Sequence, residues 1–178
     1  MKLSRIAFLF CSIVGSAGLL TQPSMAGSHD KKMAKKAAPV AMVAVEITDG
    51  PAIKAISKSL TGKAGDMVAG EKVMTSRRKG NCFACHVIEK LKPKAVTNPK
   101  KYADMGLIAP PLDGVADRYT KGELRMLIVD AKKAFPDTIM PGFYTIDGLH
   151  RVRGKFKGKT VLKPQEIEDV LAFLFTLK

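Results

Sequence analysis

The apolar residues between residue 65 and the C-terminus fall into three stretches with the three- and four-residue spacing of a helix. The first stretch begins at Asp66, a good N-cap residue, and is predicted to run to Arg78, where basic side chains complement the helix dipole and Gly80 follows. The residues expected on its buried face are Met67, Gly70, Val73 and Met74.

Two further helices are predicted nearer the C-terminus. One begins at Thr120, which forms a capping-box pattern with Glu123, and continues until Phe135 and Pro136 stop it. Its apolar positions are Leu124, Leu127, Ile128 and Ala131. The last helix begins at Pro164 in its first turn. Its buried stripe is predicted to be Ile167, Val170, Leu171, Leu174 and Leu177.

The stretches between these helices, residues 87–119 and 137–163, have no strong periodicity, and no stretch alternates as a strand would. The pattern therefore predicts an all-α fold with few helices and long loops. Loops of this length are uncommon inside a small domain. We interpret them as the covering of a large group other than side chains in the middle of the fold.

The N-terminal residues have the features of a secretory signal peptide. A short basic segment, residues 1–5, precedes an apolar run from Ile6 to Leu20, and Ser24-Met25-Ala26 has the pattern of a cleavage site. An apolar run of about 15 residues is shorter than the roughly 20 that a membrane-spanning helix needs. We therefore expect residues 1–26 to be a signal peptide cleaved near Ala26, export to a periplasm, and no integral membrane anchor after cleavage.

The exported part is divided by composition. Residues 27–45 are rich in Ala, Lys, Val and Met, and residues 46–64 have little periodicity. We expect residues 27–64 to be an N-terminal extension and residues 65–178 to be the compact domain.

Two cysteines remain once Cys11 leaves with the signal peptide. Cys82 and Cys85 stand three positions apart, and His86 follows directly, which is the C-x-x-C-H pattern of covalent haem attachment. In this chemistry the two thiols add to two vinyl groups on one haem edge, and the adjacent histidine meets the iron. The pattern predicts one haem c bound through Cys82 and Cys85, with His86 as an axial iron ligand. A plain dithiol is the alternative, and a zinc site lacks a second ligand cluster.

The second axial ligand is predicted from the methionines. Met140 lies before Pro141-Gly142 and ahead of the last helix, in a loop, whereas Met67, Met74 and Met126 lie on helical stretches where methionine usually packs in a core. We expect Met140 to be the ligand, with Met105 and His150 as the alternatives. A thioether opposite a histidine raises the potential, which suits electron transfer.

The chain is strongly basic, with 30 Lys and Arg against 16 Asp and Glu. Loss of Lys2 and Arg5 with the signal peptide lowers the net charge from +14 to +12. Such an excess favours anionic small molecules, acidic partner proteins or membrane surfaces, or is simply a solvated lysine-rich surface. Nucleic acid is not an expected partner of an exported protein.

The order of a helix, C-x-x-C-H, long loops, Met-Pro and a final helix resembles the class I cytochrome c fold over residues 65–178. Residues 109–114, Ala-Pro-Pro-Leu-Asp-Gly, are similar to the Gly-Pro-x-Leu-x-Gly stretch of that family, with Ala109 in place of the first glycine. The resemblance implies that the carbonyl of Pro110 accepts a hydrogen bond from the axial His86 and so holds the orientation of its ring.

A narrower resemblance is to SoxX, the family of monohaem subunits of SoxAX thiosulfate-oxidising complexes. It rests on these blocks: Leu60-Thr61-Gly62, Gly65-Asp66, residues 79–86, Asp117-Arg118-Tyr119-Thr120, residues 127–130, Asp137-Thr138-Ile139-Met140-Pro141 and residues 165–170. The resemblance implies a heterodimer with a SoxA-like cytochrome subunit, which would supply the cysteine that receives thiosulfate, and a downstream cytochrome as electron acceptor.

The resemblance implies an enzyme only as a subunit, in a complex of the L-cysteine S-thiosulfotransferase type. No catalysis is expected from the isolated chain, because haem attachment uses both exported cysteines. The alternative is a stand-alone periplasmic monohaem electron carrier. A gas-binding cytochrome typically carries its motif in the last helix of a bundle, whereas here the motif lies far from the C-terminus.

Overall fold

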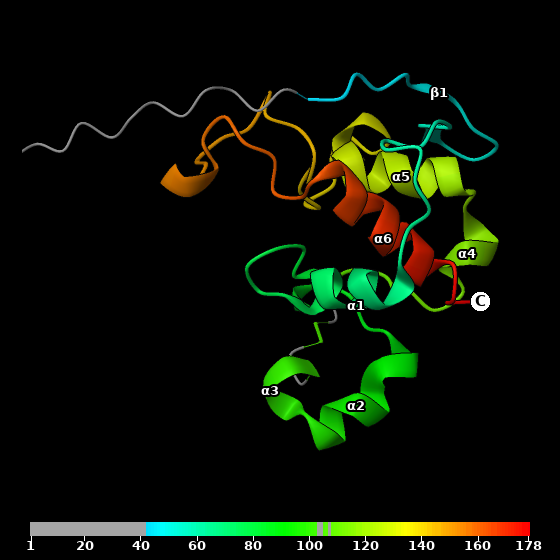
Figure 1. Cartoon of the computed structure of the whole chain (residues 1–178), viewed down its shortest axis with the longest axis vertical. Helices are drawn as coiled ribbons and strands as arrows, with labels where there is room; N and C mark the ends of the chain where they lie inside the picture. Colours follow the sequence, from blue (N-terminus) through cyan, green and yellow to red (C-terminus); the bar gives the residue numbers. More distant parts are fainter. Residues whose placement is uncertain (1–41, 103–104, 107) are drawn as a thin grey trace, which may run out of the picture. The chain divides into compact units, whose positions relative to one another are not determined.

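A computed structural model describes residues 42–102, 105–106 and 108–178. The expected signal peptide and the first part of the expected extension lie outside the described residues. Everything described falls within one unit, Ala37–Lys178. Its longer helices are α1 (Met67–Thr75), α5 (Lys121–Asp130) and α6 (Pro164–Leu174) (Figure 1). Its short elements are β1 (Thr48–Asp49), β2 (Lys54–Ala55), η1 (Cys82–Ala84), η2 (Glu89–Leu91), α2 (Lys92–Thr97), α3 (Pro99–Tyr102), α4 (Val115–Arg118), η3 (Ala131–Lys133) and η4 (Gly154–Phe156).

Helices α1 and α6 cross in close contact because glycine lies at the crossing. A Cβ atom added to Gly70 would lie 2.0 Å from the carbonyl oxygen of Asp169. The Asp66 side chain caps α1 by accepting from the backbone N–H groups of Val68 and Ala69, as predicted. All five residues of the predicted stripe on and just after α6 are buried, so that prediction is confirmed.

The prediction for α1 was wrong in two respects. The helix ends at Thr75, not Arg78, and Met67 is 55% exposed, so the buried face contains Gly70, Val73 and Met74 without it. The early end has a local cause. The N–H groups of Ser76 and Gly80 both donate to the carbonyl of Val73, which turns the chain back toward Cys82.

Helix α5 has the predicted capping box, in which the Thr120 hydroxyl accepts from the Glu123 N–H and the Glu123 carboxylate accepts from the Thr120 N–H. It ends at Asp130 and continues as the 3₁₀ turn η3, earlier than predicted. Glu123 and Arg125, which the apolar pattern leaves on the polar side, are 1% and 3% exposed. They are buried because the chain before α1 covers that side of the helix.

A two-residue antiparallel pairing joins β1 to β2, with Thr48 opposite Ala55 and Asp49 opposite Lys54. The sequence analysis predicted no strands, and an alternating pattern cannot be read from two residues. The Glu123 carboxylate accepts from the N–H groups of Ala52 and Ile53 in the turn between them and so fixes the hairpin to α5. The fold remains all-α in its main elements.

The connection 87–119 was predicted as an irregular loop but contains the short elements η2, α2, α3 and α4. None of the residues in α2 is buried, so no apolar stripe marks it in the sequence. The connection 137–163 is irregular except for η4. In the described ranges, no helix combines the length and the apolar character needed to cross a membrane.

Candidate functional site

Cys82, Cys85 and His86 belong to one tight turn. Asn81 precedes η1 in the left-handed region at a φ of 49°. The N–H groups of Cys85 and His86 both donate to the carbonyl of Cys82, at 3.2 and 3.0 Å. In a 3₁₀ turn the side chains three positions apart lie on the same side. The turn therefore presents both thiols side by side, with His86 next to the second thiol.

Both thiols are free of disulfides and half-buried. Burial raises the pKa of the Cys82 thiol to about 12, and the neighbouring Cys85 adds to the effect. The described residues also contain no group of three or more His, Cys, Asp or Glu side chains placed to hold a metal ion.

His86 is held by the segment that follows α3. Its Nδ1 lies 2.7 Å from the carbonyl oxygen of Pro110, and since a carbonyl only accepts, Nδ1 is the protonated nitrogen and Nε2 carries the lone pair. Backbone hydrogen bonds join the same two segments on either side of this contact. The Ala109 N–H donates to the Cys85 carbonyl, and the Leu112 N–H donates to the Val87 carbonyl. The ring thus has a fixed tautomer, with Nε2 as its free donor to a metal.

Two other contacts fix this arrangement. The Arg118 guanidinium donates to the carbonyls of Asp113 and Pro111, at 2.8 and 2.9 Å, and so holds the loop that carries Pro110. Gly106 donates its N–H to the carbonyl of Phe83, and a Cβ atom there would lie 2.2 Å from the Ala84 carbonyl oxygen. The backbone at residue 106 therefore lies so close to the Cys82–His86 turn that only glycine fits there.

Met140 belongs to a separate segment, which is joined to the end of α5. Its side chain is half-buried and packs against the hydrophobic core. Its N–H donates to the Thr138 hydroxyl at 3.2 Å, and Lys132 on η3 donates to the Thr138 carbonyl at 2.6 Å. Of the alternatives, Met105 is also half-buried against the core, whereas His150 is exposed. The structure brings Cys82, Cys85, His86 and Pro110 together, and the role of Met140 stays a prediction.

A polar cluster that the sequence analysis missed lies beside the turn. The Tyr102 hydroxyl donates to one oxygen of Glu71 at 2.6 Å, and Lys94 donates to the other at 2.7 Å. Burial and the Glu71 carboxylate raise the pKa of Tyr102 to about 12. The Tyr102 ring centroid lies 6.0 Å from that of Phe83, the residue that follows Cys82 in the C-x-x-C-H segment. No local pattern could show this cluster, because its members come from α1, α2 and α3.

A pocket of about 280 Å³ adjoins the same turn. Its lining residues are Thr75, Arg77, Asn81, Phe83, Ala84 and Lys101.

The donor set fits haem c. Two reduced thiols three positions apart lie on one side of a tight turn, and the adjacent imidazole has its Nδ1 engaged by a carbonyl and its Nε2 available. Histidine ligands of metals commonly have this kind of partner on the other ring nitrogen.

Comparison with known proteins agrees with this chemistry. The family model for cytochrome c matches residues 67–178. The crystal structure of SoxXA from P. pantotrophus is similar to the chain with a TM-score of 0.63 and 41% sequence identity, over 75% of this chain and 94% of the matched chain. No curated protein matches. The family match covers more than half of the chain, and the solved relative is matched over nearly its whole length, so the chain belongs to the cytochrome c family and is of the SoxX type.

Proposed function

We propose that the chain is the electron-transfer haem subunit of a periplasmic SoxAX-type complex, which oxidatively joins thiosulfate to a cysteine of a carrier protein. One haem c is attached through Cys82 and Cys85, with His86 and Met140 as its axial iron ligands. When bound, this group takes up and releases one electron at a time.

The protein's own residues set the conditions for that transfer. Pro110 holds the His86 ring through the 2.7 Å contact at Nδ1, so the ring does not need to reorient between redox states. Met140, whose N–H donates to the Thr138 hydroxyl, would supply the second iron ligand, and a thioether ligand favours the reduced state. His86 and Met140 would then leave no iron position open to outside ligands.

The proposal assigns the sulfur chemistry to a partner. Joining a thiosulfate sulfur to a cysteine sulfur removes two electrons and requires a thiol. In the proposed mature chain, haem attachment uses both cysteines, so a SoxA-like subunit must provide the thiol. A downstream cytochrome then accepts the electrons singly. The similarity to the chain in the SoxXA crystal structure supports a partner of this kind.

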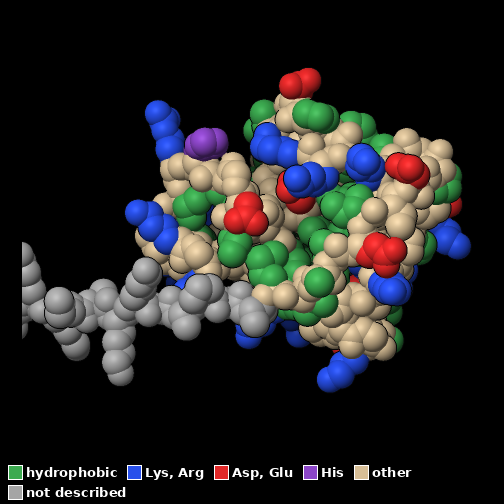
Figure 2. Space-filling model, turned by 90° about the horizontal axis from the view of Figure 1, so that it is seen from above, with side chains coloured by type: hydrophobic (Ala, Val, Ile, Leu, Met, Phe, Trp, Pro, Cys, Tyr) green, Lys and Arg blue, Asp and Glu red, His purple; other side chains and the backbone are tan. Residues whose placement is uncertain are grey.

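The surface charge bears on which partners the protein could attract. On the face seen in Figure 2, Lys and Arg side chains are interspersed with Asp and Glu. On this face the basic side chains therefore form no continuous patch, and the net positive charge agrees with a solvated lysine-rich surface.

The observation that carries the proposal is the hydrogen bond between His86 and Pro110 beside two reduced thiols. We expect Met140→Ala to abolish the methionine–iron charge-transfer band of the oxidised protein and to lower its potential, because a thioether ligand raises it. Haem should remain covalently attached after denaturation. Met105→Ala and His150→Ala are the controls. If one of them loses the band while Met140→Ala keeps it, the residue changed in that control is the ligand instead.

A pull-down from thiosulfate-grown cells tests the partner. We expect a second cytochrome to co-purify at equal stoichiometry. Recovery of the chain alone, in a redox-active form, would favour the stand-alone electron carrier instead.

A further inference from the structure

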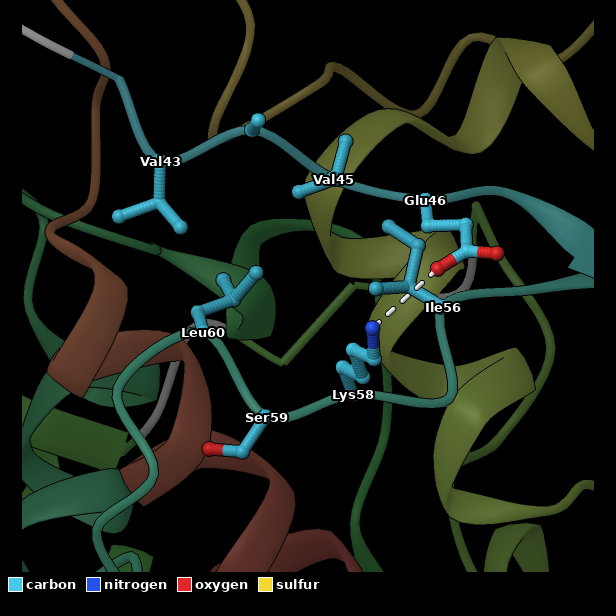
Figure 3. A pocket seen from close by; sticks show the side chains of 8 residues that line it. Val43, Val45, Glu46, Ile56, Lys58, Ser59 and Leu60 are labelled. Atoms are coloured by element: carbon cyan, nitrogen blue, oxygen red, sulfur yellow. Dashed lines mark ion pairs between the residues drawn. The ribbon is translucent and has the colours of Figure 1, made fainter.

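Residues 42–46, which we call the strap, lie upstream of the segment matched by the cytochrome c family and contact the core. Met42 and Val45 are half-buried and pack against the core cluster. Figure 3 shows the strap running across the segment 56–60, with a pocket of about 290 Å³ lined by both. Glu46 forms an ion pair with Lys58 at 3.5 Å, but both side chains are exposed, so this pair contributes little.

The strap has one directed contact over a long sequence separation. The N–H of Val43 donates to the hydroxyl of Tyr144 at 2.8 Å. Tyr144 is only 3% exposed, so its hydroxyl is the one polar atom of a buried side chain and needs a partner. The strap therefore satisfies a group that lies inside the cytochrome domain.

Tyr144 is also the end of the segment that carries Met140. The N–H groups of Phe143 and Tyr144 donate to the carbonyls of Ile128 and Val129 on α5, at 3.1 Å each. The Phe143 carbonyl accepts from the N–H groups of Val161 and Leu162. A Cβ atom at Gly142 would lie 2.5 Å from a Thr145 methyl group and 3.2 Å from the Val129 carbonyl oxygen, so the chain there passes too close to its neighbours for a side chain.

Met140 is thus supported on two sides. On the N-terminal side, Thr138 is held by η3. On the C-terminal side, Phe143 and Tyr144 are hydrogen-bonded to α5, and the Tyr144 side chain packs in the core and bonds to the strap.

We propose that Tyr144 is a positioning residue for Met140, and that its hydrogen bond to Val43 makes the strap part of the support of the axial-ligand loop. The inference rests on the proposed ligation by Met140. The strap opposes opening of the loop, and an opened loop is the state in which an outside ligand can reach the iron. The apparent affinity for an outside ligand then reports the fraction of open loop.

The experiment removes the same hydrogen bond from either end. Tyr144→Phe keeps the ring and deletes the acceptor, whereas Val43→Pro leaves Tyr144 in place and deletes the donor. The matched controls are Tyr119→Phe, a half-buried tyrosine at the end of α4, and Val43→Ala, which keeps the N–H. Imidazole is titrated into the oxidised full-length haem protein, and the methionine–iron band and the redox potential are recorded.

We expect each variant to lower the apparent imidazole dissociation constant about threefold to tenfold, the factor that one hydrogen bond of ordinary strength supplies. The double variant should show no more than the larger single effect, because both changes remove one interaction. The methionine–iron band should weaken and the potential fall, while both controls stay at the wild-type values.

Four results would overturn the inference, and they are distinguishable. An unchanged imidazole affinity in both variants contradicts it. A lower melting temperature with an unchanged methionine–iron band and potential also contradicts it, because Tyr144 and Val43 would then stabilise the fold without positioning Met140. A wild-type protein without a methionine–iron band contradicts the proposed ligation itself. Additive effects in the double variant show that the two residues act separately, which also contradicts the proposal.

Discussion

Glu123 shows how one buried carboxylate can join two parts of a chain. Its oxygens accept from the N–H groups of Ala52, Ile53 and Thr120 and from the Thr120 hydroxyl, at 2.6 to 2.9 Å. Burial opposes its ionisation, but these donors outweigh burial and lower the pKa of Glu123 from 4.5 to about 2. The same side chain thereby caps α5 and holds the β1–β2 turn.

We predict that Glu123→Gln lowers the free energy of unfolding by about 2 to 3 kcal/mol at neutral pH, because an amide cannot accept from all of these donors and buried donors lose a charged partner. The pKa of Glu123 is lower in the folded than in the unfolded protein. Its contribution is therefore complete above about pH 4.5 and is lost as the pH falls toward 2.

Denaturant unfolding at several pH values measures both effects. The stability difference between wild type and Glu123→Gln should shrink between pH 4.5 and 2. Glu46→Gln, at an exposed position, is the control and should change little at any of these pH values. A stability difference that stays constant down to pH 2 would contradict the role given to the Glu123 charge.

At the scale of elements, the α1–α6 crossing depends on Gly70. An added methyl group would overlap the Asp169 carbonyl, which is backbone and cannot rotate away. We predict that Gly70→Ala separates the two helices and lowers the free energy of unfolding by at least about 2 kcal/mol. Gly154→Ala is the control, since no atom lies within 4 Å of its added Cβ and its φ is not positive. Equal stability of the two variants in denaturant would refute the crossing argument.

A buried ion pair links the segment before α1 to two helices. Arg125 on α5 donates to both oxygens of Glu168 on α6 and to the Ile56 carbonyl, and Glu168 also accepts from the Leu60 N–H. Both side chains are nearly inaccessible, at 3% and 2%. Removal of one partner leaves a buried charge without compensation.

We predict that Arg125→Met lowers the free energy of unfolding by about 3 to 5 kcal/mol, as is typical when one partner of a buried pair is removed. Thermal and denaturant unfolding of the haem protein measure the loss. Lys58→Met breaks the exposed pair with Glu46 and should cost less than about 1 kcal/mol. If the two variants are equally stable, the segment 56–60 is not held by this pair.

The elements that could be predicted are those with a local signal. Asp66, the Thr120–Glu123 box and Pro164 mark helix starts through interactions within one turn, and α6 has a full apolar stripe. The short helices α2 and α3 could not be predicted, because helices this short are not stable alone. Their position depends on contacts such as Tyr102 and Lys94 with Glu71, which no local pattern reveals.

The residues of the candidate site also divide into those with a local sequence signal and those that depend on contacts across the molecule. Cys82, Cys85 and His86 lie within five positions of the sequence and could be proposed as a haem-attachment site from their spacing alone. The Pro110 contact was expected only through family resemblance, and the structure shows it at 2.7 Å. The contributions of Val43 and Tyr144 had no signal, because they join residues 101 positions apart and the strap was interpreted as part of an extension.

At the scale of the whole molecule, the described residues contain the parts proposed for electron transfer, and among them no thiol other than Cys82 and Cys85 is found. Both of these cysteines lie in the turn that is proposed to attach haem, and the described residues include no cluster placed to hold a further metal. We predict that the purified haem protein is reduced and oxidised reversibly but shows no thiosulfate-dependent turnover, because haem attachment would use both thiols of the proposed mature chain.

Turnover should appear when a SoxA-like subunit and a carrier protein with an accessible cysteine are added, and it should fall when this subunit is replaced by Cys82→Ala/Cys85→Ala. The assay is reduction of an external cytochrome c on addition of thiosulfate, with the partner alone as the control. Turnover by the isolated chain would overturn the division of roles. So would a complex whose rate is the same with and without the haem of this subunit, since the electrons would then leave by another route.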